Sequence, residues 1–217
     1  MSWDIFDAAA DRYERWYATP KGQRVDREEQ ALISWLLRQV PVADRVVEIG
    51  CGTGHFTEWL RSRGTQAIGL ERSPGMLAAM RRRWPGAVAL LGDALHLPMR
   101  SRSVDAVLFV TALEFLGDPR QAVAEAARVA RSGLILVVLN RRSLGGLSRR
   151  LGPQASQPLL GQAHDYTLAS VRALVRDALG GRLQQLRWRS GCFPRGIWPT
   201  PSRLPAGDVI GLAAALR

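Results

Sequence analysis

Short apolar runs alternate with helical patterns along the chain from Val46 onward. Each run is rich in Val, Ile and Leu, is bounded by Gly, Pro or Asp, and has the length of a fully buried strand rather than of a helix. This alternation predicts β–α–β units and a parallel sheet that helices cover on both faces. The predicted strands span residues 45–49, 66–71, 88–91, 104–110 and 133–139.

Helix signals occupy the intervals between these strands. The segment 73–84 opens with Ser-Pro and the segment 118–132 opens with Asp-Pro, and a capping residue followed by Pro is typical of a first helical turn. Residues 167–179 carry apolar positions at helical spacing and end at two glycines. Right-handed crossovers between consecutive strands then predict a doubly wound sheet.

The two ends of the chain are predicted to add helices and a strand pair. Residues 4–17 and 26–39 have helical patterns. Residues 140–164 are rich in Gly, Arg and Pro, and we expect a long loop that crosses the sheet edge there. Residues 184–193 and 208–216 could pair as terminal strands, although the second segment could equally form a short helix.

The formal net charge of +11 raises the question of an anionic partner. Nearly all the cations are arginine, Lys21 being the single lysine, and they are spread along the sequence rather than gathered in one stripe. We interpret this charge as a composition bias, and the short runs at 81–83, 141–142 and 149–150 as solvated helix ends or loops. Nucleic acid is therefore not the expected partner.

Cysteine and histidine give no sign of a metal or of disulfides. Cys51 and Cys192 are too few for a disulfide framework, and neither has a neighbour at metal-ligand spacing. The three histidines are isolated too, so we expect no metal site. Acidic residues stand near the amino terminus where a signal peptide would be basic, and no apolar run approaches the roughly 20 residues of a membrane span. We expect a cytoplasmic protein.

The first predicted strand runs into a turn with three alternating glycines, Gly50, Gly52 and Gly54. Glycine is needed where the backbone adopts a positive φ or lets a ligand approach closely. The helix that follows points free N–H groups into the same crevice, where an anionic group can bind. About 20 residues further on, Glu71 ends the second strand and can accept hydrogen bonds from ribose hydroxyls. These features predict a nucleoside ligand, but nicotinamide and methionine cofactors both carry ribose.

Four motifs, in order between Val46 and Leu116, resemble those of the class I S-adenosylmethionine-dependent methyltransferases. Glu48 and the glycine turn match the pattern (D/E)-x-G-x-G-x-G, Glu71 follows at the end of the second strand, and residues 92–94 match the G-D-A motif. The fourth strand is similar to (F/Y)-D-x-V followed by Leu-Glu-His. Here Val104 replaces the usual aromatic residue and Phe115 stands where many relatives have His.

The resemblance implies which residues hold S-adenosylmethionine. The three glycines would line its methionine part, with Glu48 near the ammonium group. Glu71 would bind the ribose, and Asp93 with the following backbone N–H would recognise the adenine edge. The other residues that the resemblance places around the cofactor are Cys51, Arg72, Met76, Ala94 and Thr111.

Residues 7–27 extend the resemblance to the small-molecule and quinone-type branch, methyltransferase type 11, whose amino-terminal cap helix they look like. The resemblance implies an α/β fold: a doubly wound, mainly parallel seven-stranded Rossmann-like sheet with an N-terminal helical cap. We expect one domain over residues 1–217. Its parts would be the cap at 1–40, the cofactor-binding core at 41–140, and the loop excursion with the terminal strands at 141–217.

Methyl transfer from a sulfonium is an in-line displacement, so the enzyme mainly has to position the acceptor and exclude water. No nucleophilic side chain is required. A base is often needed for the acceptor's proton, and the candidates are Glu114, His164 and Tyr13. We expect Tyr13, Trp16 and Tyr17 on the cap, together with the 140–164 excursion, to enclose an apolar pocket for a small-molecule acceptor.

Three alternatives remain open at this point. A nicotinamide-dependent oxidoreductase would need G-x-G-x-x-G and hydride-transfer residues that the sequence does not show. An RNA methyltransferase is suggested by the basic charge, but the Asn/Asp-Pro-Pro-aromatic sequence is missing after the fourth strand. A protein that binds S-adenosylmethionine without catalysis is the third alternative. Oligomeric state is not predicted.

Overall fold

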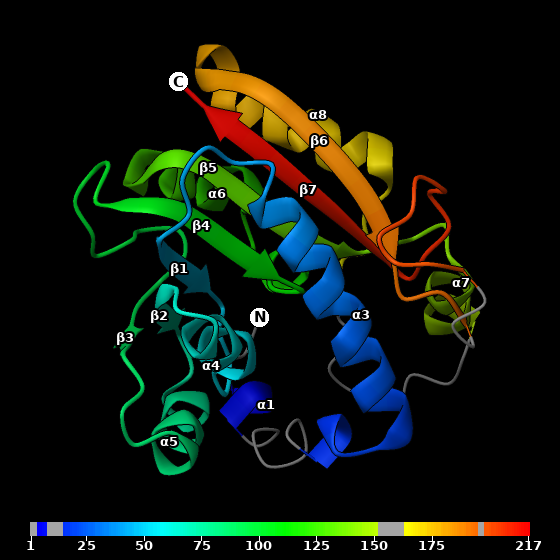
Figure 1. The fold of residues 1–217 in the computed structure, drawn as a ribbon, viewed down its shortest axis with the longest axis horizontal. Helices are drawn as coiled ribbons and strands as arrows, with labels where there is room; N and C mark the ends of the chain where they lie inside the picture. The colour runs from blue at the N-terminus through cyan, green and yellow to red at the C-terminus, as the bar shows by residue number, and fades with distance from the viewer. Residues whose placement is uncertain (1–3, 8–14, 152–162, 195–197) are drawn as a thin grey trace.

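A seven-stranded sheet forms the centre of the molecule (Figure 1), in the order β3-β2-β1-β4-β5-β7-β6. The computed structural model describes residues 4–7, 15–151, 163–194 and 198–217. The strands are β1 (Arg45–Ile49), β2 (Gln66–Glu71), β3 (Ala89–Leu91), β4 (Val104–Val110), β5 (Ala130–Leu139), β6 (Leu183–Gly191) and β7 (Val209–Leu216). The predicted α/β class and seven-stranded sheet are confirmed.

Strands β1 to β5 run parallel, and β7 lies antiparallel between β5 and β6. The chain goes from β1 outward to β2 and β3, and then returns to place β4 on the other side of β1. The crossovers after β1 and β4 therefore leave in opposite directions. In open α/β sheets this reversal creates a crevice at the carboxyl ends of the strands, where ligands bind.

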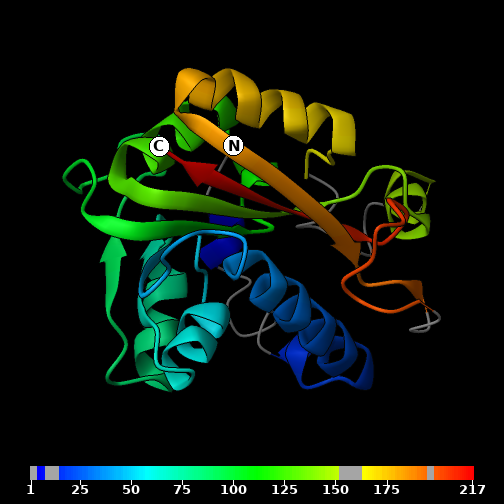
Figure 2. The same cartoon turned by 45° about the horizontal axis from the view of Figure 1, so that its top comes forward.

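Helices cover both faces of the sheet (Figure 2). On one face, α3 (Pro20–Leu37) and α4 (His55–Ser62) pack against Val46 and other buried strand residues. On the opposite face, α6 (Pro119–Val129) and α8 (Leu168–Leu179) pack against Val47 and its neighbours. The adjacent Val46 and Val47 serve opposite faces because successive strand residues point to opposite sides. Helix α5 (Pro74–Arg83) lies beside β2 and β3.

Two boundaries in the second half of the sheet differ from the predicted ones. Strand β5 begins at Ala130, three residues before the predicted start at Gly133, because α6 ends at Val129 and the chain passes directly into the strand. Ala130 already pairs with Val104 of β4. Strand β7 is fully buried between β5 and β6, so the helical alternative for residues 208–216 was wrong. The segment forms a strand because it pairs with β5 on one side and with β6 on the other. Its own sequence does not reveal this pairing.

Helix α3 begins at Pro20, six residues before the predicted start. The Thr19 side chain accepts a hydrogen bond from the Gly22 N–H, and Pro20 occupies the first turn, so the cap and the proline together start the helix. Of the predicted helix at 4–17, the described parts are α1 (Asp4–Asp7) and the helical residues 15–17. Residues 8–14 lie outside the described residues.

The segment predicted as a long loop at 140–164 contains a helix, α7 (Leu144–Leu151). Ser143 Oγ accepts a hydrogen bond from Gly146 N–H, and Asp208 accepts one from Gly145 N–H. These acceptors satisfy N–H groups in the first turn of α7. The Gly-rich composition of the segment had favoured a loop over this helix. Residues 152–162 of the excursion lie outside the described residues.

Candidate functional site

The turn after β1 adopts the backbone conformation that its glycines predict. Gly50, Gly52 and Gly54 have φ angles of 71°, 54° and 81°. The N–H groups of Gly50 and Cys51 both donate to the carbonyl of Leu70 in β2, at 2.8 and 3.1 Å. The turn is thus tied to the neighbouring strand, at the carboxyl edge of the sheet.

The three glycines meet different surroundings. A Cβ atom at Gly50 would lie 2.6 Å from the Ala112 Cβ, and one at Gly54 would lie 2.6 Å from the end of Met80. At Gly52 the nearest atom to such a Cβ is the Met76 sulfur, 4.0 Å away. Gly50 and Gly54 therefore allow close packing within the protein, whereas the backbone of Gly52 stays open to a ligand.

Glu71 gathers backbone N–H groups from both sides of this opening. One carboxylate oxygen accepts from Gly52 N–H at 2.9 Å, and the other accepts from Arg72 and Ser73 N–H, each at 2.8 Å. The side chain is buried. The carboxylate lies where the glycine turn and the end of β2 meet, which is the position that the ribose prediction requires.

Asp93 follows the end of β3 and is fixed by two contacts. One oxygen accepts from Leu95 N–H at 2.9 Å, and the other pairs with Arg72 Nη1 at 3.1 Å. Arg72 therefore links the ends of β2 and β3, although its guanidinium remains largely exposed. Ala94, next to Asp93, is buried.

Glu48 lies beneath the glycine turn and is 2% exposed. Its carboxyl group accepts a hydrogen bond from the Thr57 hydroxyl of α4 at 2.5 Å. Burial raises the pKa of Glu48 to about 8, and the hydrogen bonds from Thr57 oppose this rise. Glu48 therefore ties β1 to α4. Sequence reasoning missed Thr57, because its partner is nine residues away.

The remaining residues predicted around the cofactor lie on the same edge. Cys51 and Met76 are buried, and burial raises the pKa of the Cys51 thiol. Thr111, just after β4, has a φ of 46°, which is rare for a β-branched residue. Its N–H donates to Val137 O at 2.8 Å, which fixes this strained turn to β5.

The amino-terminal segment reaches this edge through residues that sequence reasoning missed. Asp7 of α1 accepts hydrogen bonds from the Ser73 hydroxyl and from Gly75 N–H. Phe6 contacts Phe115 edge-on, with ring centroids 5.2 Å apart. Phe115, which stands where many relatives have His, thus packs against the start of the chain. No local pattern in the sequence marks Asp7.

The cap helix is joined to the glycine turn through His55. The Tyr17 and His55 rings stack with centroids 3.8 Å apart, and His55 Nε2 lies 2.8 Å from the Asp26 carboxylate. Trp16 contacts Tyr17 edge-on and is 38% exposed. Tyr13 lies outside the described residues. Of the three predicted acceptor-binding aromatics, Tyr17 is therefore buried, with its ring stacked on His55.

The candidate bases differ in their surroundings. Glu114, in the short 3-10 helix η1 (Leu113–Phe115), is 2% exposed, and burial raises its pKa to about 7. One of its oxygens accepts from Leu139 N–H. His164 is exposed, and its backbone N–H donates to the Glu114 carbonyl at 2.9 Å. Tyr13, the third candidate, lies outside the described residues.

Comparison with known sequences adds an independent line of evidence. A family model described as a methyltransferase domain matches residues 47–138. An uncharacterized methyltransferase of Mycobacterium tuberculosis is 38% identical over 149 residues, which are 68% of this chain and 57% of that protein. The chain thus spans little more than half of this relative. A malonyl-[acyl-carrier protein] O-methyltransferase of Yersinia pestis is 37% identical over 55% of this chain and 43% of its own length. A demethylmenaquinone methyltransferase of Renibacterium salmoninarum is 37% identical over 43% and 40%.

Solved structures agree with the sequence relatives. A methyltransferase of Thermotoga maritima, described as a possible histamine N-methyltransferase, superposes over 100% of both chains with a TM-score of 0.77 and 26% identity. The chain belongs to the class I S-adenosylmethionine-dependent methyltransferases. A magnesium protoporphyrin IX methyltransferase of Synechocystis with bound S-adenosylhomocysteine shares the fold, with a TM-score of 0.67 and 18% identity over 99% and 97% of the chains.

S-adenosylmethionine is the cofactor of this methyltransferase family, and the residues at the carboxyl edge fit it. The backbone at Gly52 is open, because a Cβ atom added there would have no neighbour nearer than 4.0 Å. Beside it, the Glu71 carboxylate presents acceptors for vicinal hydroxyls, and Asp93 presents an acceptor one strand further out. Among the described residues, no group of three or more His, Cys, Asp or Glu could hold a metal ion.

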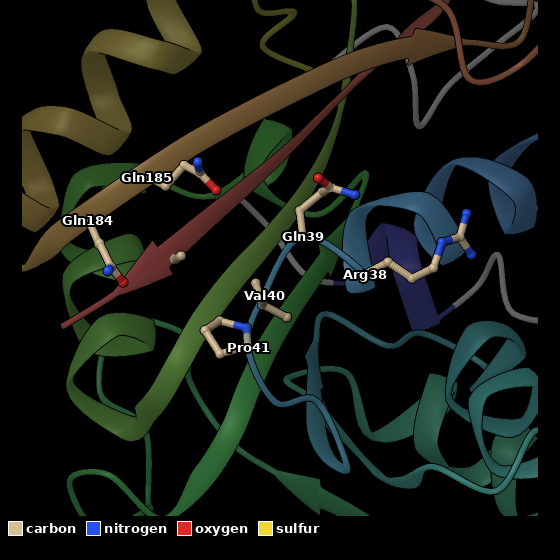
Figure 3. A pocket seen from close by; sticks show the side chains of 7 residues that line it. Arg38, Gln39, Val40, Pro41, Gln184 and Gln185 are labelled. Carbon is tan, nitrogen blue, oxygen red and sulfur yellow. The ribbon is translucent and has the colours of Figure 1, made fainter.

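A separate pocket of about 550 Å³ lies at the opposite edge of the sheet (Figure 3). The side chains that line it include Arg38, Gln39, Gln184 and Gln185, from the α3–β1 connection and the start of β6. This edge carries the amino ends of the parallel strands, and ligands of such sheets bind at the carboxyl ends. The glycine turn, rather than this pocket, is therefore the candidate cofactor site.

Proposed function

We propose that this protein transfers the methyl group of S-adenosylmethionine to a small-molecule acceptor at the carboxyl edge of β1 and β4. The observation that carries the proposal is the Glu71 carboxylate, which is buried and hydrogen-bonded to the one glycine of the turn whose backbone is open. Two of the named proteins support a small acceptor: one relative is a demethylmenaquinone methyltransferase, and one structure is described as a possible histamine N-methyltransferase.

Methyl transfer requires no covalent bond between the protein and the substrate. S-adenosylmethionine supplies a methyl group that its sulfonium has already activated. The residues of this chain have to hold the donor, align the acceptor and exclude water, which is how proximity accelerates a displacement. Gly52 and Glu71 would serve the first task, and the acceptor would be aligned at the same edge of the sheet.

The arginines of this chain weaken the case for a nucleic-acid acceptor. Arg128 binds Glu125 and the carbonyls of Leu97 and Met99, and Arg182 donates to the carbonyls of Ala127 and Ala130. These guanidinium groups satisfy backbone acceptors at the end of α6 and in a neighbouring loop. Part of the net charge of +11 is thus used inside the structure rather than presented to a phosphate backbone.

Calorimetry with S-adenosylhomocysteine and NAD, side by side, tests the cofactor assignment. We expect S-adenosylhomocysteine alone to bind, and Glu71→Gln to weaken its binding at least about tenfold, because the amide keeps the shape but has lost one acceptor and the charge. Glu58→Gln, on the half-exposed side of α4, is the matched control and should bind like wild type. Binding of NAD instead would overturn the proposal.

A labelled-methyl assay on metabolite extracts tests the transfer itself. We expect label from the methyl donor to accumulate in a small organic product. Label that enters only RNA, with binding that falls steeply as salt is raised, would instead support the nucleic-acid alternative. Absence of any labelled product from a chain that binds S-adenosylhomocysteine would support a binding protein without catalysis.

A further inference from the structure

The buried face of α3 carries an acidic residue where its pattern requires an apolar one. Leu32, Ile33 and Leu36 on this face are 0% exposed. Glu29 precedes them at the i, i+3, i+4, i+7 spacing and is itself 6% exposed. Charged side chains are rarely buried in this way unless they are paired. Glu29 therefore needs an explanation that packing does not supply.

Several contacts place Glu29 at the same edge of the sheet as Glu114. The Cys192 thiol donates to the carbonyl of Val25, one turn before Glu29 on α3. Cys192 follows Gly191 of β6, which pairs with Val209 of β7, and Val209 pairs with Leu139 at the end of β5. Leu139 N–H donates to Glu114. The first half of α3 and η1 therefore lie at the same edge of the sheet, at the carboxyl ends of β4 and β5.

Neither carboxyl group forms an ion pair with a described residue. Glu114 Oε2 is buried and has no hydrogen-bond partner among these residues, and no described side chain pairs with Glu29. The neighbouring acids are occupied. Asp26 contacts His55 and Gln30, Glu28 contacts Arg24 and Thr200, and Asp165 contacts Arg149.

The electrostatics agree with this geometry. Burial, followed by Asp26, Glu28 and Glu114, raises the pKa of Glu29 to about 8. Burial also raises the pKa of Glu114 to about 7, with Asp165 adding to the rise and Arg149 opposing it. Tyr166 and Cys192 also face this pair, and the pKa of each is raised by burial and by one of the two glutamates. The acidic residues of this cluster thus oppose one another's ionisation, in a chain whose net charge is +11.

This edge is also adjacent to the donor site. Ala112, two residues before Glu114, lies so close to Gly50 that a Cβ there would be 2.6 Å from the Ala112 Cβ. On the other side, Asp26 of α3 reaches His55, which directly follows the glycine turn. Helix α3 therefore bridges from the glycine turn to Glu114, and an acceptor between them would lie beside the donor.

We propose that Glu29 and Glu114 form the binding site for the methyl acceptor, and that this acceptor is a small amine that enters as its ammonium form. The inference rests on the proposed function and names its substrate class. Two buried carboxyl groups without an ion-pair partner are costly when ionised, and a bound ammonium supplies the missing charge. A neutral alcohol or a carboxylate would supply none.

The chemistry balances with these residues alone. Ionised Glu114 takes one proton from the bound ammonium through Oε2, which leaves a neutral amine and a protonated carboxyl group. The amine lone pair then forms the N–C bond to the methyl group while the C–S bond breaks, and its electron pair stays on sulfur. The products are a methylated ammonium and S-adenosylhomocysteine. A carboxyl group that titrates near neutral pH suits a base of this kind.

Competition between matched acceptors tests the proposal. Purified protein is given labelled S-adenosylmethionine and a panel of small amines, such as histamine and 2-phenylethylamine, each beside the isosteric alcohol. We expect amines to be methylated at least about tenfold faster than their alcohols. Glu29→Gln and Glu114→Gln should lower this rate at least tenfold, with unchanged binding of S-adenosylhomocysteine. Glu28→Gln, whose carboxylate already pairs with Arg24, is the control and should keep the amine preference.

A second readout separates substrate binding from a structural role. Calorimetry of histamine with the S-adenosylhomocysteine complex, in two buffers of different ionisation enthalpy, measures protons released on binding. We expect release at pH 7 because the cation favours the ionised carboxylates, and less release in both glutamine variants. Alcohols methylated as fast as amines, no amine methylated at all, or proton release that the variants do not change would overturn the inference. Such results with intact S-adenosylhomocysteine binding would leave the proposed function standing, whereas loss of that binding would defeat both.

Discussion

Three acidic residues end neighbouring parallel strands, yet each has a different role at the scale of single residues. Glu48 is buried under the glycine turn against Thr57. Glu71 collects backbone N–H groups around the opening, and Asp93 is paired with Arg72. The same chemical group thus contacts a threonine hydroxyl in one place, backbone N–H groups in the next and an arginine in the third. Burial and partners make this difference.

Substitutions of two glycines in the same turn should separate ligand binding from folding. Gly52→Ala places a Cβ in open space at a φ of 54°, so we expect a loss of about 1–2 kcal/mol in stability and at least about tenfold weaker binding of S-adenosylhomocysteine. Gly50→Ala adds a clash with Ala112 and should cost roughly 2–5 kcal/mol. Urea unfolding and calorimetry measure both quantities.

The opposite ranking would contradict this assignment of the glycines. If Gly52→Ala bound S-adenosylhomocysteine like wild type, the ligand would not approach the backbone at this position. Equal stability of Gly50→Ala and Gly52→Ala would show that Ala112 gives way easily.

At the scale of elements, α3 joins the two halves of the candidate site. Its apolar face packs on β5 and β7, where Gly211 leaves room for Leu32 and Leu36. Its first half reaches the glycine turn through Asp26 and His55. A helix fixed at both places can hold Glu29 at the edge of the sheet, and the Thr200 hydroxyl, which donates to Glu28, adds a contact from the segment after β6.

A double-mutant cycle on Asp26 and His55 should measure this connection. We expect Asp26→Ala and His55→Ala each to lower the free energy of unfolding, and their effects to fall short of additivity by about 1 kcal/mol, because either change removes the same contact. Asp26→Ala combined with Arg63→Ala, at the far end of α4, is the control pair and should be additive. Additive losses in the first pair would mean that the 2.8 Å contact does not stabilise the docking of α3.

At the scale of the whole molecule, burial of three carboxyl groups governs the response to pH. Burial raises the pKa values of Glu29 and Glu48 to about 8 and that of Glu114 to about 7, from 4.5 in the ordinary case. At a pH between the ordinary pKa of 4.5 and these raised pKa values, the three carboxyl groups are protonated in the folded chain and ionised in the unfolded chain. Stability therefore falls as pH rises through this window. The arginines stay charged throughout, so their mutual repulsion does not change.

Urea unfolding at pH 5, 6.5 and 8 should show this decline in wild type. Glu29→Gln removes one of the three contributions, so we expect a shallower decline and a gain in stability over wild type that is larger at pH 8 than at pH 5. A stability that rises from pH 5 to pH 8 would show that these carboxyl groups are not buried in this way in solution.

Much of the fold followed from local patterns. Strand limits at 45–49, 66–71 and 104–110 matched the structure because each apolar run is short and is flanked by polar residues or glycine. The helices α5 and α8 matched within one residue at each end because Ser73 and Thr167 cap them. The glycine turn and Glu71 were also predicted at the edge where the structure places them. These features depend on residues that are neighbours in sequence.

Contacts between distant segments decided the rest. The antiparallel place of β7 depends on β5 and β6 on either side, and the start of α7 depends on Asp208, more than 60 residues away. The contact of Asp7 with Ser73 depends on the assembled sheet. The place of Glu29 at the same edge as Glu114 depends on it too. The sequence by itself determined the periodic elements and the donor motif, because short-range sterics and caps specify them. Only the tertiary structure decided which carboxyl groups are buried away from solvent, because burial depends on every segment that packs around them.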